Sequence, residues 1–268
     1  MPAPREIPIR KPRFAIEEAP TDWFGGNVFA SHVFDALSST FPDGEAFFVK
    51  SVQRFRGEID DPALAEAVRS FSGQEAQHRH QHDQHVALLV ERGYPALETR
   101  NRVMRAANAF FVRRLPRTAL ASTAAVEHLT ALLARRLLRE EGAFCRDMHP
   151  RMVELWQWHA LEESEHKAVA FEVLEQVAPA YPRRAFALIG NSIGLAFEVL
   201  DRTVYMLWKD GLLFRRDVWR DGLRFLFGAD GLFRGLGPDY RAWYRRDFHP
   251  DQIDDSALLA EWREKIAA

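Results

Sequence analysis

The sequence predicts an all-α protein built around a four-helix bundle. Alternation of apolar and polar residues, the mark of a strand, is missing, while helix-favouring Ala, Leu, Glu and Arg dominate. Apolar residues recur at helical spacing in four segments: 41–58, 62–92, 118–141 and 150–177. With 268 residues and 47% hydrophobic content, the chain can bury a large core.

The first two helices carry recognisable start and stop residues. Pro42 and Asp43 suit the first turn of the first helix. Asp61 can cap the second helix, Pro62 fits its first position, and Gly93 ends it. The two segments are therefore expected to form a hairpin.

The second pair of helices follows a long connection. Residues 94–117 are expected to form a crossover that contains a helical piece. The third helix is expected from Thr118 to just before Gly142. The fourth is expected to start at Pro150 and to end before Pro179.

The flanking parts differ in composition from the bundle segment, 31–182. Residues 1–30 are rich in Pro and charge and predict an N-terminal arm. Residues 183–268 predict additional C-terminal helices packed on the bundle. Within them, the apolar stretch 186–213 precedes several arginines, so homodimer contact, peripheral membrane contact and plain packing on the bundle are all open.

Overall composition excludes several classes of protein. Lys and Arg total 36 against 38 Asp and Glu, so there is no basic surplus for nucleic acid. Cys145 is the only cysteine, which excludes an internal disulfide and a cysteine-based metal cluster. The first residues lack a signal-peptide core, and no stretch is apolar enough to span a membrane. We therefore expect a cytoplasmic protein.

Two Glu-x-x-His motifs carry the candidate chemistry. They are Glu75–His78 and Glu163–His166, each on the row of its helix that periodicity turns inward. Residues three apart lie about 60° from each other and one turn along the axis, so both can reach one ion. A buried carboxylate or imidazole is costly without such a partner.

The other two helices each contribute one glutamate within an apolar stripe, Glu45 and Glu127. The chain order is then Glu, Glu-x-x-His, Glu, Glu-x-x-His, the arrangement of ferritin-like di-metal carboxylate bundles. Spacing agrees, because 30 residues separate Glu45 from Glu75 and 36 separate Glu127 from Glu163. Four carboxylates balance two divalent ions, and mixed carboxylate and imidazole ligands favour iron, with manganese as the alternative.

His159 is a candidate seventh ligand. It precedes Glu163 by four residues, so it lies on the same face as Glu163 and His166. The alternative is a core histidine bonded to a carbonyl or carboxylate group. Glu162 and Glu165 compete with Glu163, which we prefer because Glu162 points about 100° away from that face.

The chain resembles a bacterial family of predicted metal-dependent hydrolases. The resemblance is carried by Glu75–His78 (EAQH), by Trp158–Phe171 (WHALEESEHKAVAF) and by the tail Tyr244–Pro250 (YRRDFHP). It spans residues 10–260 and implies a ferritin-like metal site at the positions already named.

Three functions fit these features. The leading hypothesis is an O2-dependent di-iron oxidase or oxygenase, which needs an electron donor and acts on a small apolar molecule. Residues 183–214 would then wall a tunnel, and Thr123 and Thr130 would line the pocket. The second is a metal-dependent hydrolase whose two ions activate water. The third is a non-catalytic metal-binding or storage protein.

Overall fold

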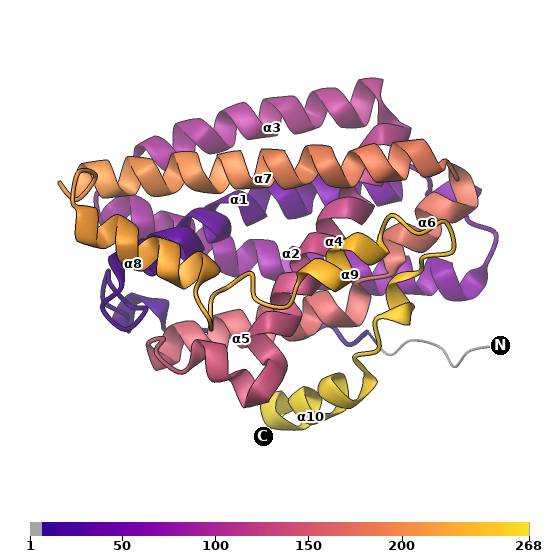
Figure 1. Cartoon of the computed structure of the whole chain (residues 1–268). Coiled ribbons are helices and arrows are strands. Elements are labelled where there is room, and N and C mark those ends of the chain that lie inside the picture. Colours follow the sequence, from indigo (N-terminus) through magenta and orange to yellow (C-terminus); the bar gives the residue numbers. More distant parts are fainter. Residues whose placement is uncertain (1–6, 268) are drawn as a thin grey trace.

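The computed structural model describes residues 7–267, apart from the side chains at positions 140, 141, 143 and 267. Within that range the α-helices are α1 Val28–Gln53, α2 Pro62–Glu91, α3 Ala96–Arg114, α4 Pro116–Gly142, α5 Pro150–His166, α6 Val169–Val177, α7 Tyr181–Lys209, α8 Arg216–Phe227, α9 Gly237–Ala242 and α10 Ser256–Ala267 (Figure 1). The only β-pairing among the described residues is an isolated bridge between Phe24 and Met148. The all-helical prediction is confirmed.

Two helical hairpins form the centre of the molecule. α1 packs along α2, and α4 packs along α5, while α1 and α4 also touch each other. α3 connects the two hairpins and lies against α1 and α4, as expected of a crossover. The long helix α7 crosses the outside of both α1 and α4 (Figure 1). α8 packs on α1, and α10 packs on α5.

A layer of buried polar side chains, called the polar layer, lies between two apolar clusters and includes Glu45, Glu127 and Glu163. The first cluster draws on residues 29–41, 134–138 and 152–161, and the second on residues 47–71, 119–125 and 169–174. On α1, Glu45 falls between Phe41 of the first cluster and Phe47 of the second. Glu127 on α4 and Glu163 on α5 also lie between residues of the two clusters, in reversed order on α4 and with the second cluster beginning on α6 after Glu163. Apolar side chains therefore close the polar layer from both ends.

The predicted start of the first helix, near Phe41–Asp43, is wrong. α1 begins at Val28, where the side chain of Asn27 caps it by accepting the amide of Ala30. Pro42 sits inside the helix, where it removes only the one amide that would bond the carbonyl of Ser38. The buried apolar face of α1 continues on both sides of the proline, and this packing keeps the helix intact.

The fourth predicted helix, 150–177, is divided in two. α5 ends at His166, and α6 begins at Val169. The interruption coincides with Lys167, whose ammonium group donates to the carbonyl of Ile253 and to Asp255. The second and third predicted helices agree with α2 and α4 to within two residues at each end.

α7 has one packed face and one bare face. Leu188, Met206 and Leu207 are buried beneath it, so packing on the bundle accounts for one side. Phe186, Ile193 and other apolar residues on the opposite side are exposed. In the described part of the chain, no helix combines the length and apolarity needed to cross a bilayer. Dimer contact and peripheral membrane contact stay predictions for the exposed face.

The division of the chain at residues 30 and 182 also stays a prediction. Before α1 begins, residues 7–27 contain the 3-10 helix Ile16–Glu18, turns, and the bridge from Phe24 to Met148. Residues 1–6 of the expected arm and residue 268 of the expected extension lie outside the described residues.

Gly222 on α8 should not tolerate a side chain. A Cβ at this position would lie 2.4–2.6 Å from the buried ring of Phe29. We expect Gly222→Ala to lower the free energy of unfolding by about 1–3 kcal/mol, although alanine favours helices. Gly190→Ala on α7 meets no atom within 4 Å and should stabilise by about 0.5–1 kcal/mol. Urea unfolding of both variants tests this, and a more stable Gly222→Ala protein would contradict it.

Candidate metal centre

The polar layer gathers all seven predicted ligand side chains. Each is no more than 3% exposed. They come from four helices: Glu45 from α1, Glu75 and His78 from α2, Glu127 from α4, and His159, Glu163 and His166 from α5. Helical periodicity explains the convergence, because residues three, four and seven apart share one face of a helix.

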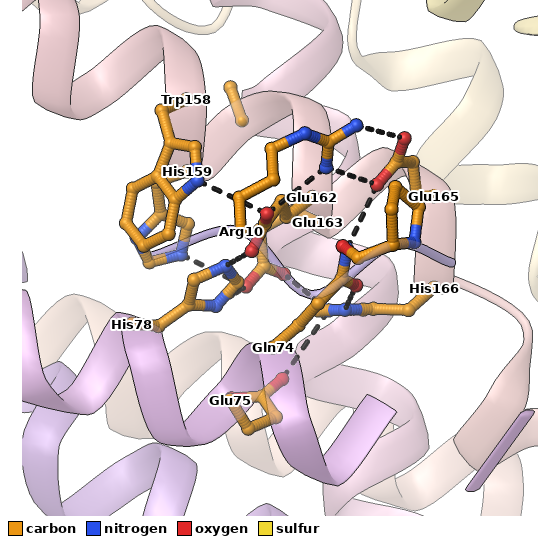
Figure 2. Close-up of polar contacts among 12 residues, drawn as sticks. Arg10, Gln74, Glu75, His78, Trp158, His159, Glu162, Glu163, Glu165 and His166 are labelled. Carbon is orange, nitrogen blue, oxygen red and sulfur yellow. Dashed lines mark hydrogen bonds and ion pairs between the residues drawn. The ribbon is translucent and has the colours of Figure 1, made fainter. Parts of the chain in front are cut away.

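His166 faces three carboxylates. Its Nε2 atom lies 3.3 Å from Glu75, 3.2 Å from Glu127 and 3.7 Å from Glu163. The other ring nitrogen, Nδ1, donates to the amide oxygen of Gln74 at 3.0 Å (Figure 2). Because Nδ1 carries the hydrogen, Nε2 of a neutral ring points its lone pair at the carboxylates. Glu75, Glu127 and His166 thus form one group of potential ligands.

His78 anchors a second group. Its Nδ1 atom lies 3.6 Å from Glu163, and it can share an ion with Glu75 and Glu163 or with Glu45 and His159. Nε2 of His78 donates to the carboxylate of Glu162 at 3.0 Å. The second imidazole therefore also turns one nitrogen inward and bonds the other to an outer acceptor.

The inward-facing carboxylates lack hydrogen-bond donors. Both oxygens of Glu45, Glu75 and Glu127 are buried without a hydrogen-bond partner among the described residues, as are the inner nitrogens of His78 and His166. Unpaired acceptors at such depth are strongly unfavourable. Bound cations would satisfy all of them, so the residues present fit a metal centre.

Burial and mutual repulsion shift the acidity of these groups. Burial raises the pKa of Glu45 and Glu75 well above the usual range, and neighbouring carboxylates add to the effect. Burial also raises the pKa of Glu127 to about 7, against the opposing charge of His166. Burial would also raise the pKa of Glu163, but the imidazoles of His159 and His166 beside it outweigh burial and lower it. Such a cluster would gain greatly from divalent cations.

A layer of outer residues holds the two inner imidazoles, and the sequence did not predict it. The guanidinium of Arg10 donates to Glu162 at 3.0 Å and to Glu165 at 2.8 and 2.9 Å (Figure 2). Glu165 accepts from Gln74, which holds His166. Arg10 lies in the segment expected to be a featureless arm, and its own sequence context gives no signal of this role.

The structure separates Glu163 from its two competitors. Glu163 points at the other carboxylates, whereas Glu162 turns outward to accept from Arg10 and from the indole of Trp158 at 3.1 Å. Glu165 is also outward, between Arg10 and Arg263. The preference for Glu163 agrees with this placement. The spacing of Trp158 and Glu162, four residues apart, is the signal that could have revealed the outer pair.

The remaining histidines lie outside the two groups. His82, one turn beyond His78, contacts His159 rather than a carboxylate. His80 is exposed, and His128 stacks on Trp243 away from the centre.

A small apolar cavity of about 40 Å³ borders the centre. It is lined by Val33, Phe34, Leu37, Phe41, Thr130, Leu133, Ala134, Leu137, Trp156, His159, Ala160, Glu163 and Leu232. Thr130 therefore lines it as expected, whereas Thr123 instead pairs with Ser51. Residues 183–214, expected to wall a tunnel, contribute nothing to this lining.

Comparison with known families agrees with this geometry. The sequence profile of a family described as predicted metal-dependent hydrolase matches residues 8–254. The chain belongs to this family. Searches among curated proteins and among solved structures gave no match. The resemblance stated from the motifs is therefore confirmed, and the family description supports a metal at the cluster of buried Glu and His.

Glu127→Gln should stabilise the metal-free protein in a pH-dependent way. The folded-state pKa of Glu127, about 7, exceeds the unfolded value near 4.5, so wild-type stability falls as pH rises from 5 to 8. Glutamine stays neutral, and the advantage of the variant should grow by roughly 1–3 kcal/mol over this interval. Urea unfolding without metal at pH 5 and pH 8 measures it. An advantage that does not change with pH would contradict the assignment.

Arg10→Met should weaken metal binding without touching a proposed ligand. The variant removes the guanidinium that Glu162 and Glu165 bind. Glu162 and Gln74, which hold His78 and His166, are then less well fixed. We expect about a tenfold lower affinity for Mn²⁺ in competition with a chelator. Arg69→Met is the control, because its pair with Glu66 is exposed. Equal affinities for the two variants would contradict a role for Arg10.

Proposed function

We propose that the protein is a metal-dependent hydrolase with two divalent ions in a ferritin-like bundle. One observation carries the proposal: the oxygens of Glu45, Glu75 and Glu127 lie in a closed apolar interior, where no described residue donates a hydrogen bond to them. Protons or metal cations are then their remaining partners, and the family description favours metal cations. The family description supplies the reaction type.

The ligand groups divide naturally between two ions. Glu75, Glu127 and His166 would hold one, and Glu45, His78 and His159 the other. Glu163, which can share an ion with Glu75 and His78, would be a further ligand. Glu75 takes part in the His78 group and in the His166 group, which suits a bridging carboxylate. Four carboxylates would then neutralise two divalent charges, and this mixed ligand set suits iron or manganese.

The topology supports the ferritin-like assignment. Each hairpin supplies one helix with a lone glutamate and one helix with Glu-x-x-His, and α3 provides the long crossover between the hairpins.

Bound ions in such a centre lower the pKa of water and polarise a carbonyl or phosphoryl oxygen. The protein's own residues have three tasks. Arg10, Glu162 and Gln74 hold the two inner imidazoles in place. The apolar clusters exclude bulk water from the charged layer. The cavity beside His159 and Glu163 accepts the apolar end of a small substrate, so the bond to be cleaved would lie at the edge of the centre.

O2-dependent oxidation is the second candidate. The observation that favours it is the apolar lining of the cavity, because a cavity of this kind stays dry and admits apolar molecules such as O2. This reaction would need iron and an electron donor. The buried Cys145 is consistent with the reducing cytoplasm that we propose as the location.

Metal-loaded protein separates the candidates. We expect purified protein to bind two Mn²⁺ or Zn²⁺ ions and to hydrolyse short-chain aryl esters. Glu163→Gln should reduce the rate at least 100-fold, whereas Glu66→Gln, on the exposed face of α2, should leave it unchanged. Inactive Mn²⁺ and Zn²⁺ forms together with rapid O2 consumption by the Fe²⁺ form would contradict hydrolysis and favour oxidation. Uptake of many iron ions without turnover would instead indicate storage.

A further inference from the structure

A chain of buried polar side chains runs outward from the centre to α1. His159 Nδ1 lies 2.6 Å from His82 Nε2, and His82 Nδ1 lies 2.7 Å from the hydroxyl of Ser38. The same hydroxyl lies 2.7 Å from His85 Nδ1, and His85 Nε2 lies 3.3 Å from Asp35. All five residues are no more than 3% exposed. Their contacts are therefore with one another and not with solvent.

Asp35 at the outer end is held as a carboxylate. The indole of Trp23 donates to its Oδ1 atom at 2.9 Å, and His32 lies 3.6 Å from Oδ2. Burial would lower the pKa of His32, but the carboxylates of Asp210 and Asp35 outweigh it and raise this pKa to about 9, so a cation faces Asp35. The pKa of Asp35 is lowered despite its burial. This end of the chain can only accept hydrogens.

The inner end is also a carboxylate. Glu163 Oε1 lies 2.9 Å from His159 Nε2, which makes five contacts from Glu163 to Asp35. A neutral imidazole carries one hydrogen, so three such rings and one hydroxyl supply four hydrogens for the five contacts. In this arrangement one contact lacks a hydrogen.

Asp35 can only accept, and this decides which of the five contacts lacks a hydrogen. If His85 donates to Asp35, then Ser38 donates to His85, His82 to Ser38, and His159 to His82. The gap then falls between His159 Nε2 and Glu163, where two bare acceptors face each other at 2.9 Å. A metal ion bound to both atoms would compensate the missing hydrogen at this contact.

We propose that Ser38 and Asp35 are positioning residues of the metal centre. Through the chain they hold His159 with its hydrogen on Nδ1 and present the bare Nε2 atom to a cation. The inference rests on the proposed two-metal function and makes His159 a ligand. A histidine that binds metal through one nitrogen gains basicity when the other donates to a fixed acceptor, and here the acceptor is fixed from α1.

Nitrogen NMR of the full-length protein labelled with ¹⁵N-histidine tests the proposal. Zn²⁺ is the probe, since it is diamagnetic, and His159→Gln identifies the signals of His159. We expect wild-type His159 to carry its hydrogen on Nδ1 and to bind Zn²⁺ through Nε2. Ser38→Ala breaks the chain and should lower Zn²⁺ affinity about tenfold, with a second form of His159 that carries the hydrogen on Nε2. Ser39→Ala is the matched control, because its buried hydroxyl donates only to the carbonyl of Ala36.

The outcomes separate this inference from the proposed function. Normal Zn²⁺ binding with identical behaviour of Ser38→Ala and Ser39→Ala overturns the inference alone, as does a wild-type His159 with its hydrogen on Nε2 in the zinc form. A wild-type protein that binds neither Zn²⁺ nor Mn²⁺ overturns the metal centre and the inference with it.

Asp35→Asn keeps the test decisive if Ser38→Ala does not fold. Its amide oxygen can still accept from Trp23, but the negative charge that orients the chain is gone. We expect a several-fold loss of Zn²⁺ affinity and the same shift in the His159 signals. Wild-type affinity and spectra in Asp35→Asn overturn the proposal.

Discussion

The organisation of this protein follows from one constraint, which is negative charge enclosed where water cannot reach it. Four glutamates occupy a layer that apolar clusters close on both sides, and in the described part of the chain no lysine or arginine pairs with them. Removing a carboxylate from water is expensive unless an opposite charge comes with it. The bundle leaves that compensation to protons or to metal ions, and the membership of a metal-dependent family points to the latter.

The surrounding residues make sense as support for two imidazoles under this constraint. His78 and His166 each turn one nitrogen inward and bond the other to Glu162 or Gln74. Arg10 binds the outer carboxylates, so the layer outside the centre has its own charge balance. The positive charge of Arg10 therefore lies outside the proposed ligands. There it can orient them through Glu162 and Glu165 without competing with a bound cation.

The burial of the proposed inner ligands was predictable from the sequence, whereas the residues that hold them were not. Glu45, Glu75, Glu127 and Glu163 interrupt apolar rows of fixed period, so sequence alone marks them as buried and in need of a partner. Arg10 has no periodic context, and its position depends on contacts with residues more than 150 positions away. The start of α1 was missed because a proline that packing tolerates inside the helix was interpreted as its first turn. For the same reason, the residues of α1 that face His82 and His85 were also missed.

The docking of the N-terminal segment has a consequence for the order of assembly. Arg10 closes on Glu162 across 152 positions, and the backbone of Pro8 and Pro12 accepts from Gln74 and Gln81 on α2. Contacts this distant in sequence form late, since closing long loops is entropically slow. The segment synthesised early thus waits for α5 before Arg10 can bind. Because α5 also carries His159, Glu163 and His166, the buried cluster and the contacts of Arg10 both depend on the docking of this one helix.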